Sequence, residues 1–164
     1  MSNFEKCVDA LCRMAVAEDS GAVEKARADI RNLMDTEVYQ AAVKVKDAES
    51  LIRRVLLELG APDHLIGHPY VCRAIGLVIE DPLYINNISF CLYPKIAAEF
   101  DTTPQRVERA IRHLVEIVFE RCDFDTIMKY FGNTINANKG KATNGEFIAR
   151  IANVVKMQLK NAAE

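Results

Sequence analysis

The sequence has no tryptophan and few histidines or aromatic residues. It holds three histidines and five prolines in 164 residues, and 7% of its residues are aromatic. No run of about 18 apolar residues occurs, which argues against a membrane-spanning helix. Acidic residues lie near the N-terminus, where a signal peptide would need an apolar centre. We therefore expect a cytoplasmic protein with no membrane partner.

The cysteine pattern excludes a disulfide framework. The five cysteines are an odd number and include no C-x-x-C pair, so reduced thiols are expected. A chain of this length also buries enough surface to fold without a metal or a disulfide. His64, His68 and Cys72 have the spacing of zinc ligands on one helix, but Gly67 and Pro69 interrupt such a helix. No fourth ligand is evident, so we expect no metal site.

Motifs of the common enzyme classes are also absent. The sequence has no glycine-rich phosphate loop, no nucleophile elbow and no H-E-x-x-H motif. These motifs place backbone N–H groups, a nucleophile or metal ligands in a reacting geometry. We expect a protein that is not an enzyme, needs no cofactor and has no small-molecule substrate.

The charges are unevenly distributed along a nearly neutral chain. The formal net charge is −2 at pH 7, yet basic side chains outnumber acidic ones in residues 102–164 and nowhere else. A part of the surface can carry a net charge even when the net charge of the whole chain is close to zero. An anionic partner is therefore expected to bind the last third of the chain.

Apolar residues recur at spacings of three and four, and strand-like alternation is hard to find. We predict an all-α fold, a multi-helix bundle with a short N-terminal helical extension. In the extension, residues 4–14 and 22–34 are predicted helices, while residues 36–46 fit either a short helix or a connector. The chain is divided into an extension at 1–46 and a domain at 47–164. The helices predicted in the domain cover residues 47–59, 70–79, 92–100, 104–121, 123–131 and 143–159.

Helices 92–100 and 104–121 have the proportions of a helix-turn-helix. Ala97 is small where the two helices would cross, and Thr103 and Pro104 can cap and start the second helix. An ordinary helical hairpin is the alternative. The apolar contacts between the two helices are predicted to come from Ile96, Phe100, Val107 and Ile111.

The second of these helices divides into an apolar side and a polar side when projected at the helical repeat. Arginine can bond bidentately to guanine, and glutamate can accept a hydrogen bond from cytosine. Glu108 and Arg112 could equally form a solvated salt bridge worth about 0.3–0.5 kcal/mol. The polar side carries Gln105, Arg106, Glu108, Arg109, Arg112, His113 and Glu116.

A second basic element follows in residues 139–144. Lys139 and Lys141 precede Thr143 and Asn144, where a capping box with Glu146 predicts a helix start. Lysine side chains beside free backbone N–H groups suit a phosphate oxygen. A solvated loop is the alternative reading of this segment.

Four stretches of the sequence together carry a family resemblance. They are LYPKIAAEFDTTPQRVERAIRH at 92–113, Phe-Gly-Asn-Thr at 131–134, KGKATNGEFIA at 139–149 and, more weakly, ELGAPDHLIGHPYVCRAI at 58–75. From about Asp47 to Leu159 the chain resembles the C-terminal effector domain of the sporulation response regulators of the stage 0 sporulation protein A family.

The resemblance implies a six-helix domain that places a recognition helix in the major groove of promoter DNA, as a homodimer on tandem sites. It assigns base contacts to Glu108, Arg109 and Arg112, and a DNA contact to Lys160, which could otherwise be a solvated charge. Double-stranded DNA is thus the expected partner. The phosphate or register contacts expected around these residues come from Gln105, Arg106, His113, Lys139, Lys141, Thr143 and Asn144.

The sequence departs from the family pattern in two respects. Family members carry an N-terminal phosphoacceptor receiver, whereas about 46 residues precede the domain here, so we expect no phosphorylation control in cis. Ala142, Gly145 and His68 replace the usual proline, serine and tyrosine. The alternative function is therefore a protein-interaction modulator that pairs with a full-length sporulation regulator and does not read DNA.

Overall fold

The computed structural model describes residues 21, 23–26, 28, 47–132 and 140–161. The chain divides into two compact units, Met1–Lys46 and Asp47–Glu164. In the first unit the described residues are helical, in line with the helix predicted from Ala22. The other segments predicted there lie outside the described residues.

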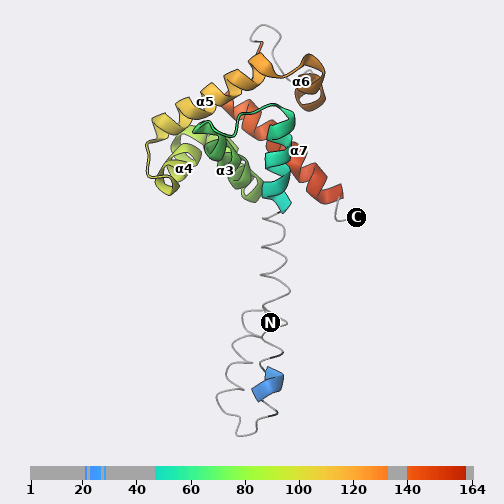
Figure 1. Cartoon of the computed structure of the whole chain (residues 1–164). Coiled ribbons are helices and arrows are strands. Elements are labelled where there is room, and N and C mark those ends of the chain that lie inside the picture. The colour runs from blue at the N-terminus through green and yellow to red at the C-terminus, as the bar shows by residue number, and fades with distance from the viewer. Residues whose placement is uncertain (1–20, 22, 27, 29–46, 133–139, 162–164) are drawn as a thin grey trace. The chain divides into compact units, whose positions relative to one another are not determined.

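The described part of the second unit consists of helices and connecting turns, with no strand. A helix at residues 47–58 comes first. The remaining elements are α3 (Gly67–Glu80), the 3-10 helix η1 (Pro82–Asn87), the π-helical turn η2 (Ile88–Leu92), α4 (Tyr93–Glu99), α5 (Pro104–Arg121), α6 (Phe124–Phe131) and α7 (Asn144–Asn161). The predicted all-α class is confirmed (Figure 1).

Local capping interactions explain most of the helix ends. The helix at 47–58 ends at Gly60, whose φ of 67° is left-handed and which donates its N–H to Leu57 at 2.9 Å. Thr103 Oγ1 accepts the N–H of Arg106 at 3.3 Å at the start of α5, with Pro104 in the first turn. Asp123 accepts the N–H of Thr126 at 2.9 Å before α6. The bounds of α5 agree with the predicted 104–121, and the start of this helix is set by a local cap.

Two elements differ from the sequence prediction. Helix α3 begins at Gly67, three residues before the predicted start, so Pro69 lies in its first turn, where a missing N–H costs little. Residues 82–92 form η1 and η2, for which no helix was predicted. Their hydrogen-bond patterns do not repeat at 3.6 residues, so α-helical periodicity does not detect them.

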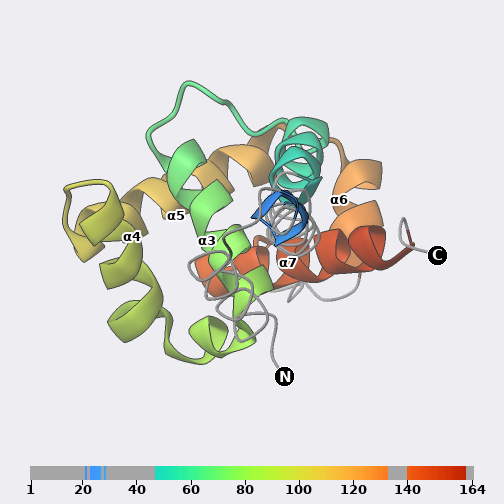
Figure 2. The ribbon, with the colours of Figure 1, turned by 90° about the horizontal axis from the view of Figure 1, so that it is seen from below.

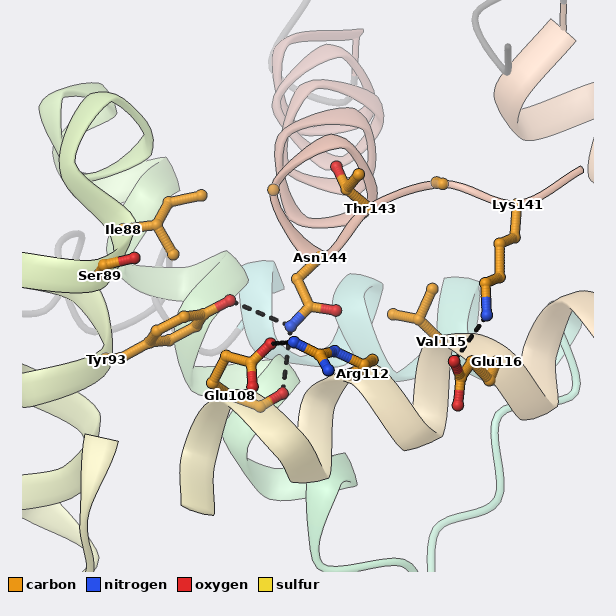
Figure 3. Close-up of a pocket in the computed structure, with 12 residues that line it drawn as sticks. Ile88, Ser89, Tyr93, Glu108, Arg112, Val115, Glu116, Lys141, Thr143 and Asn144 are labelled. Carbon is orange, nitrogen blue, oxygen red and sulfur yellow. Dashed lines mark hydrogen bonds and ion pairs between the residues drawn. The ribbon is translucent and has the colours of Figure 1, made fainter. Parts of the chain in front are cut away.

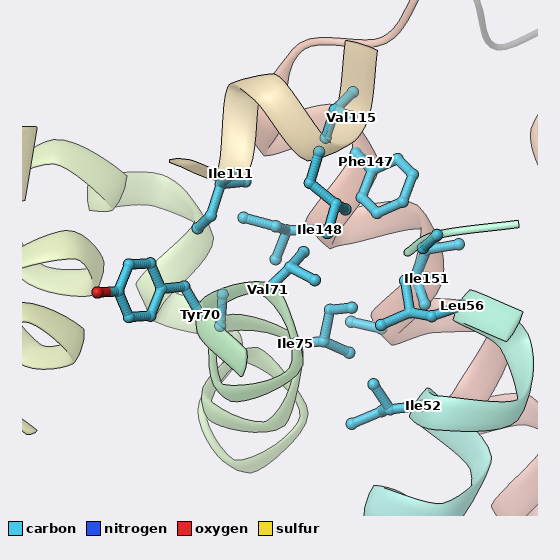
Figure 4. Close-up of a cluster of buried hydrophobic side chains, with 14 of the residues drawn as sticks. Ile52, Leu56, Tyr70, Val71, Ile75, Ile111, Val115, Phe147, Ile148 and Ile151 are labelled. Atoms are coloured by element: carbon cyan, nitrogen blue, oxygen red, sulfur yellow. The ribbon is translucent and has the colours of Figure 1, made fainter. Parts of the chain in front are cut away.

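Helix α3 lies at the centre of the second unit and packs against both α5 and α7. In Figure 2, α4 and α6 lie on opposite sides, with α3 between them. Figure 4 shows the side chains of Val71 and Ile75 meeting Ile148 and Ile151 of α7 and Leu56 of the first helix. All of these side chains are fully buried, so one core supports every helix that carries the site.

A glycine allows α3 and α5 to approach closely. A Cβ atom at Gly67 would lie 2.2 Å from the carbonyl oxygen of Ala110 in α5. No side chain can occupy that space without separating the helices. Because Gly67 has no side chain, the backbone of α5 can lie directly against the N-terminus of α3.

Helix α4 is held to α3 by a fork of hydrogen bonds. Arg73 of α3 donates from Nε to Glu99 at 2.6 Å and from its Nη2 atom to the other oxygen at 3.0 Å. Both side chains are about one-third exposed, and bidentate geometry of this kind fixes orientation as well as distance. The first helix of the predicted helix-turn-helix is thus oriented by α3.

Candidate nucleic-acid interface

Helices α4 and α5 form the predicted pair and are joined by a tight turn at Phe100–Thr103. Thr102 donates its N–H to the carbonyl of Ala97 at 2.9 Å. Asp101 has a φ of 49°, a left-handed conformation that aspartate tolerates better than most residues. The turn brings the N-terminus of α5 beside the end of α4.

Three of the four residues predicted to form contacts between the two helices are buried. Ile96, Val107 and Ile111 are fully buried. The prediction for Phe100 needs a correction, because its side chain is 40% exposed and its ring packs edge-on against Tyr70 of α3 at a centroid distance of 5.0 Å. Phe100 lies at the C-terminal cap of α4, where the chain has already turned away from the crossing.

Helix α5 buries one side and exposes the other, as its sequence predicts. Its buried residues are Val107, Ile111, Leu114, Val115 and Val118. The opposite side presents Gln105, Arg106, Arg109, Arg112 and His113 to solvent. The apolar side fixes the helix on the core, which leaves a row of hydrogen-bond donors facing outward.

The arginines on this helix have different surroundings. Arg112 donates to the carboxylate of Glu108 one turn earlier, and the Arg112 side chain is 60% exposed. Arg109 is exposed and forms no hydrogen bond or ion pair with a described residue. The Arg112 guanidinium is thus held along the helix, while the Arg109 guanidinium is available to a ligand.

The start of α7 is closed by the predicted capping box. Thr143 donates its N–H to Glu146 at 2.7 Å, and Glu146 donates its N–H to Thr143 Oγ1 at 3.3 Å. The expectation of free backbone N–H groups is therefore wrong at Thr143. The physical reason is that the third residue of a capping box satisfies the N–H of the cap itself.

Asn144 joins three helices. Its side-chain amide donates to Tyr93 Oη of α4 and to the backbone carbonyl of Glu108 in α5, both at 3.1 Å. Both contacts are partly buried, and burial raises the pKa of Tyr93, so its hydroxyl stays protonated. Asn144 thus positions the start of α7 against the helix-turn-helix.

Lys141 makes the one long-range ion pair that a described residue forms with the polar side of α5. Its Nζ donates to Glu116 at 2.6 Å. This hydrogen bond, followed by the Lys141 charge, lowers the pKa of Glu116. The segment before α7 is therefore linked to α5 by a charged contact as well as by Asn144.

These groups surround a groove of about 620 Å³ between α5, η2 and the start of α7. Figure 3 shows Tyr93 and Asn144 meeting over Glu108 and Arg112, with the Lys141–Glu116 pair at the other end. Of the predicted DNA-contacting residues, Glu108, Arg112, Lys141, Thr143 and Asn144 line this groove, while Gln105, Arg106, Arg109 and His113 are exposed on α5.

The other predicted residues lie elsewhere. Lys160 is exposed in the last turn of α7, and Lys139 is outside the described residues. His68 is buried, and its Nδ1 lies 3.7 Å from the sulfur of Cys72, while His64 precedes α3 and is exposed. Among the described residues, no group of three acidic, histidine or cysteine side chains could hold a metal ion.

Sequence reasoning missed the roles of Tyr93 and Glu116. The sequence places Tyr93 only within the predicted helix 92–100 and Glu116 only on the polar side of the predicted helix 104–121. Lys141 is 25 residues from Glu116 along the chain, so no local spacing signals that pair. The helical periodicity of α5 does show that Glu116 lies on the same side as Arg112.

Residues 52–155 match the family described as Sporulation initiation factor Spo0A C terminal. The match begins within the first helix of the second unit and extends into α7, so it includes the helix-turn-helix and the groove. In the described residues no helix is long and apolar enough to span a bilayer. The chain belongs to the Spo0A C-terminal family of DNA-binding domains that regulate transcription in sporulation, which is not a family of enzymes.

Proposed function

We propose that this protein reads a promoter box in double-stranded DNA by placing α5 in the major groove. The observation that carries the proposal is the exposed row of Gln105, Arg106, Arg109, Arg112 and His113 on a helix whose other side is buried. A recognition helix needs both properties, since its buried side fixes the angle at which its donors meet the base edges.

Arg109 and Arg112 are assigned the base contacts. Arg109, which pairs with no described residue, can donate two hydrogen bonds to guanine O6 and N7. Glu108 either accepts from a base or orients Arg112, with which it pairs in the free protein. An arginine already held in one rotamer loses less conformational entropy when it binds.

The remaining predicted residues are assigned to the DNA backbone. Contacts of this kind set register and give affinity that falls with salt, because each neutralised phosphate releases counterions. Asn144 is given a positioning role, since its amide bonds to Tyr93 and Glu108. The proposed backbone contacts are Gln105, Arg106, His113, Lys139, Lys141 and Lys160; Thr143 is not among them, because its N–H and its hydroxyl both donate to Glu146.

The test is a fluorescence-anisotropy titration of the wild type and Arg109→Ala against the promoter box of the family and a scrambled duplex. Arg109→Ala should lose about 1–3 kcal/mol of discrimination between the two duplexes. The matched control is Arg121→Ala, which removes an exposed arginine from the C-terminal turn of the same helix and should keep the preference. An unchanged preference in Arg109→Ala would show that α5 is not the recognition helix.

We also propose that residues 1–46 supply self-association, so that a homodimer occupies tandem boxes. Support comes from the apolar spacing of residues 4–14 and 22–34 and from the division of the chain at Lys46. If the wild type shows no preference for the box at any salt concentration, the alternative function follows, in which this unit recruits a full-length regulator.

A further inference from the structure

Two cations on the proposed DNA-binding surface are paired with acidic side chains, and the two pairs differ in kind. Arg112 pairs with Glu108 one turn away on the same helix, so this pair moves with α5. Lys141 pairs with Glu116 across the groove at 2.6 Å, which joins the segment before α7 to α5 (Figure 3). The Lys141–Glu116 pair therefore limits the positions that the Lys141 ammonium group can take up.

Glu116 lies among groups that are proposed to contact DNA. It follows Arg112 by four residues and His113 by three on the same helix, and both add to the lowering of its pKa after Lys141. Its carboxylate is therefore ionised at neutral pH. Beside a polyanion, an ionised carboxylate that loses its cation is unfavourable.

Building on the proposed function, we infer that Glu116 restrains Lys141 and thereby sets the affinity of this surface for the DNA backbone. To bind a phosphate, Lys141 has to leave Glu116, and the vacated carboxylate then faces DNA without a partner. Lys141 thus adds little net affinity while Glu116 is present. This restraint weakens binding to the DNA backbone, whatever the DNA sequence. Base contacts therefore supply a larger share of the total binding free energy.

The experiment is a double-mutant cycle of the wild type, Glu116→Gln, Lys141→Met and the double variant. Each protein is titrated by fluorescence anisotropy against the promoter box and the scrambled duplex at several salt concentrations. On both duplexes, Glu116→Gln should make the plot of the logarithm of the binding constant against the logarithm of the salt concentration steeper by about 0.9. It should also raise the affinity about fivefold near 150 mM salt. Lys141→Met should weaken binding only modestly alone, and the gain from Glu116→Gln should be clearly smaller in that background than in the wild type, because most of the gain comes from releasing Lys141.

Glu120→Gln is the matched control, since it removes the same charge one turn further along α5. Glu120 is exposed and forms no ion pair with a described residue. The control should leave the steepness of the salt dependence within error of the wild type. Equal circular dichroism spectra and melting temperatures across the set would show that the variants fold alike.

Three results would overturn the inference. A gain from Glu116→Gln that is equally large in the Lys141→Met background would mean that the carboxylate acts on DNA by repulsion alone and not through Lys141. Weaker binding by Glu116→Gln would mean that Glu116 presents Lys141 productively, and unchanged binding would mean that the pair has no effect. Loss of box preference in the wild type would instead overturn the proposed function, while the cycle on scrambled DNA would still report on Glu116.

Discussion

Gly67 and His68 are neighbouring residues whose surroundings leave little freedom for substitution. Gly67 meets the backbone of α5, and His68 is buried, with its Nδ1 atom 3.7 Å from the sulfur of the partly buried Cys72. The sequence marks Gly67 and Pro69 as interruptions of a helix, yet both lie inside α3. At the scale of single residues, the sequence shows that a glycine or histidine lies at an irregular position. The residues that pack against it in the folded protein explain why that residue type is needed there.

Gly67→Ala should destabilise the protein by roughly 1–3 kcal/mol, because overpacking at a helix crossing forces the backbones apart. The clash is with a carbonyl oxygen at 2.2 Å, which cannot rotate away as a side chain can. Urea unfolding followed by circular dichroism measures the change. In Gly76→Ala, on the same helix, the new methyl meets nothing within 4 Å, and stability should rise by up to about 1 kcal/mol. Equal effects of the two substitutions would argue against the close approach.

His68 should make the protein less stable in mild acid. Burial, followed by the charge of Arg53, holds the pKa of His68 below its usual value, while Asp63 opposes this. The unfolded state, with a histidine pKa of about 6.5, then binds the proton more readily than the folded state. The contribution of His68 to stability is thus complete above that pH and is lost as pH falls through the folded-state pKa.

Urea unfolding of the wild type and His68→Gln at a series of pH values between about 7.5 and 5 tests this. The free energy of unfolding should fall with pH in the wild type and less steeply in the variant. Cys72 does not contribute in this range, since burial raises the pKa of its thiol to about 11. Parallel pH profiles for the two proteins would assign the acid sensitivity to other groups.

At the scale of the helices, ends are better predicted than irregular elements. Thr103, Asp123 and Thr143 each accept a backbone N–H three residues on, an interaction that depends on residue type and spacing alone. The segment at 82–92 also has a local cap, since Asp81 accepts the N–H of Leu83 at 2.9 Å, but its 3-10 and π turns do not follow the 3.6-residue repeat. Helices with local caps could therefore be read from the sequence, whereas these turns could not.

Thr143→Ala should cost about 1 kcal/mol of stability by opening the capping box at the start of α7. Thr143 Oγ1 both donates to Glu146 at 2.9 Å and accepts its N–H, so the variant loses both interactions. Thr143→Ser retains the hydroxyl and should remain close to the wild type. Urea unfolding compares the three proteins, and a Ser variant as unstable as the Ala variant would point to lost methyl packing instead of lost capping.

At the scale of the whole molecule, the two units can be tested separately. Residues 47–164 contain the family match and the groove, and this unit has its own core. A chain of residues 47–164 should remain folded and keep its preference for a single box, because the proposed contacts all lie within it. If residues 1–46 drive self-association, this shortened chain should have the mass of a monomer in light scattering.

Full-length protein under the same conditions should have a larger mass and should bind tandem boxes more tightly than the shortened chain, because two linked domains raise the effective concentration. Glu120→Gln in the full chain serves as a control for effects of net charge on scattering. Equal masses for the two chains, with and without DNA, would remove the case for self-association through residues 1–46.

The sequence by itself determined the all-α class, the bounds of α5 and the polar side that α5 presents to solvent. These features follow from capping residues and from the 3.6-residue repeat, both of which act within a few residues of chain. The resemblance carried by residues 92–113 and 139–149 likewise led to the family, because those stretches are contiguous.

Only the tertiary structure decided which side chains meet across helices. It paired Lys141 with Glu116, directed Asn144 to Tyr93 and Glu108, and placed Phe100 against Tyr70. Each contact depends on how the helices cross, and the crossing is set by the packing of the whole core, including the space that Gly67 leaves. No local pattern contains that geometry, because the partners are distant in sequence and their distance is fixed by every helix between them.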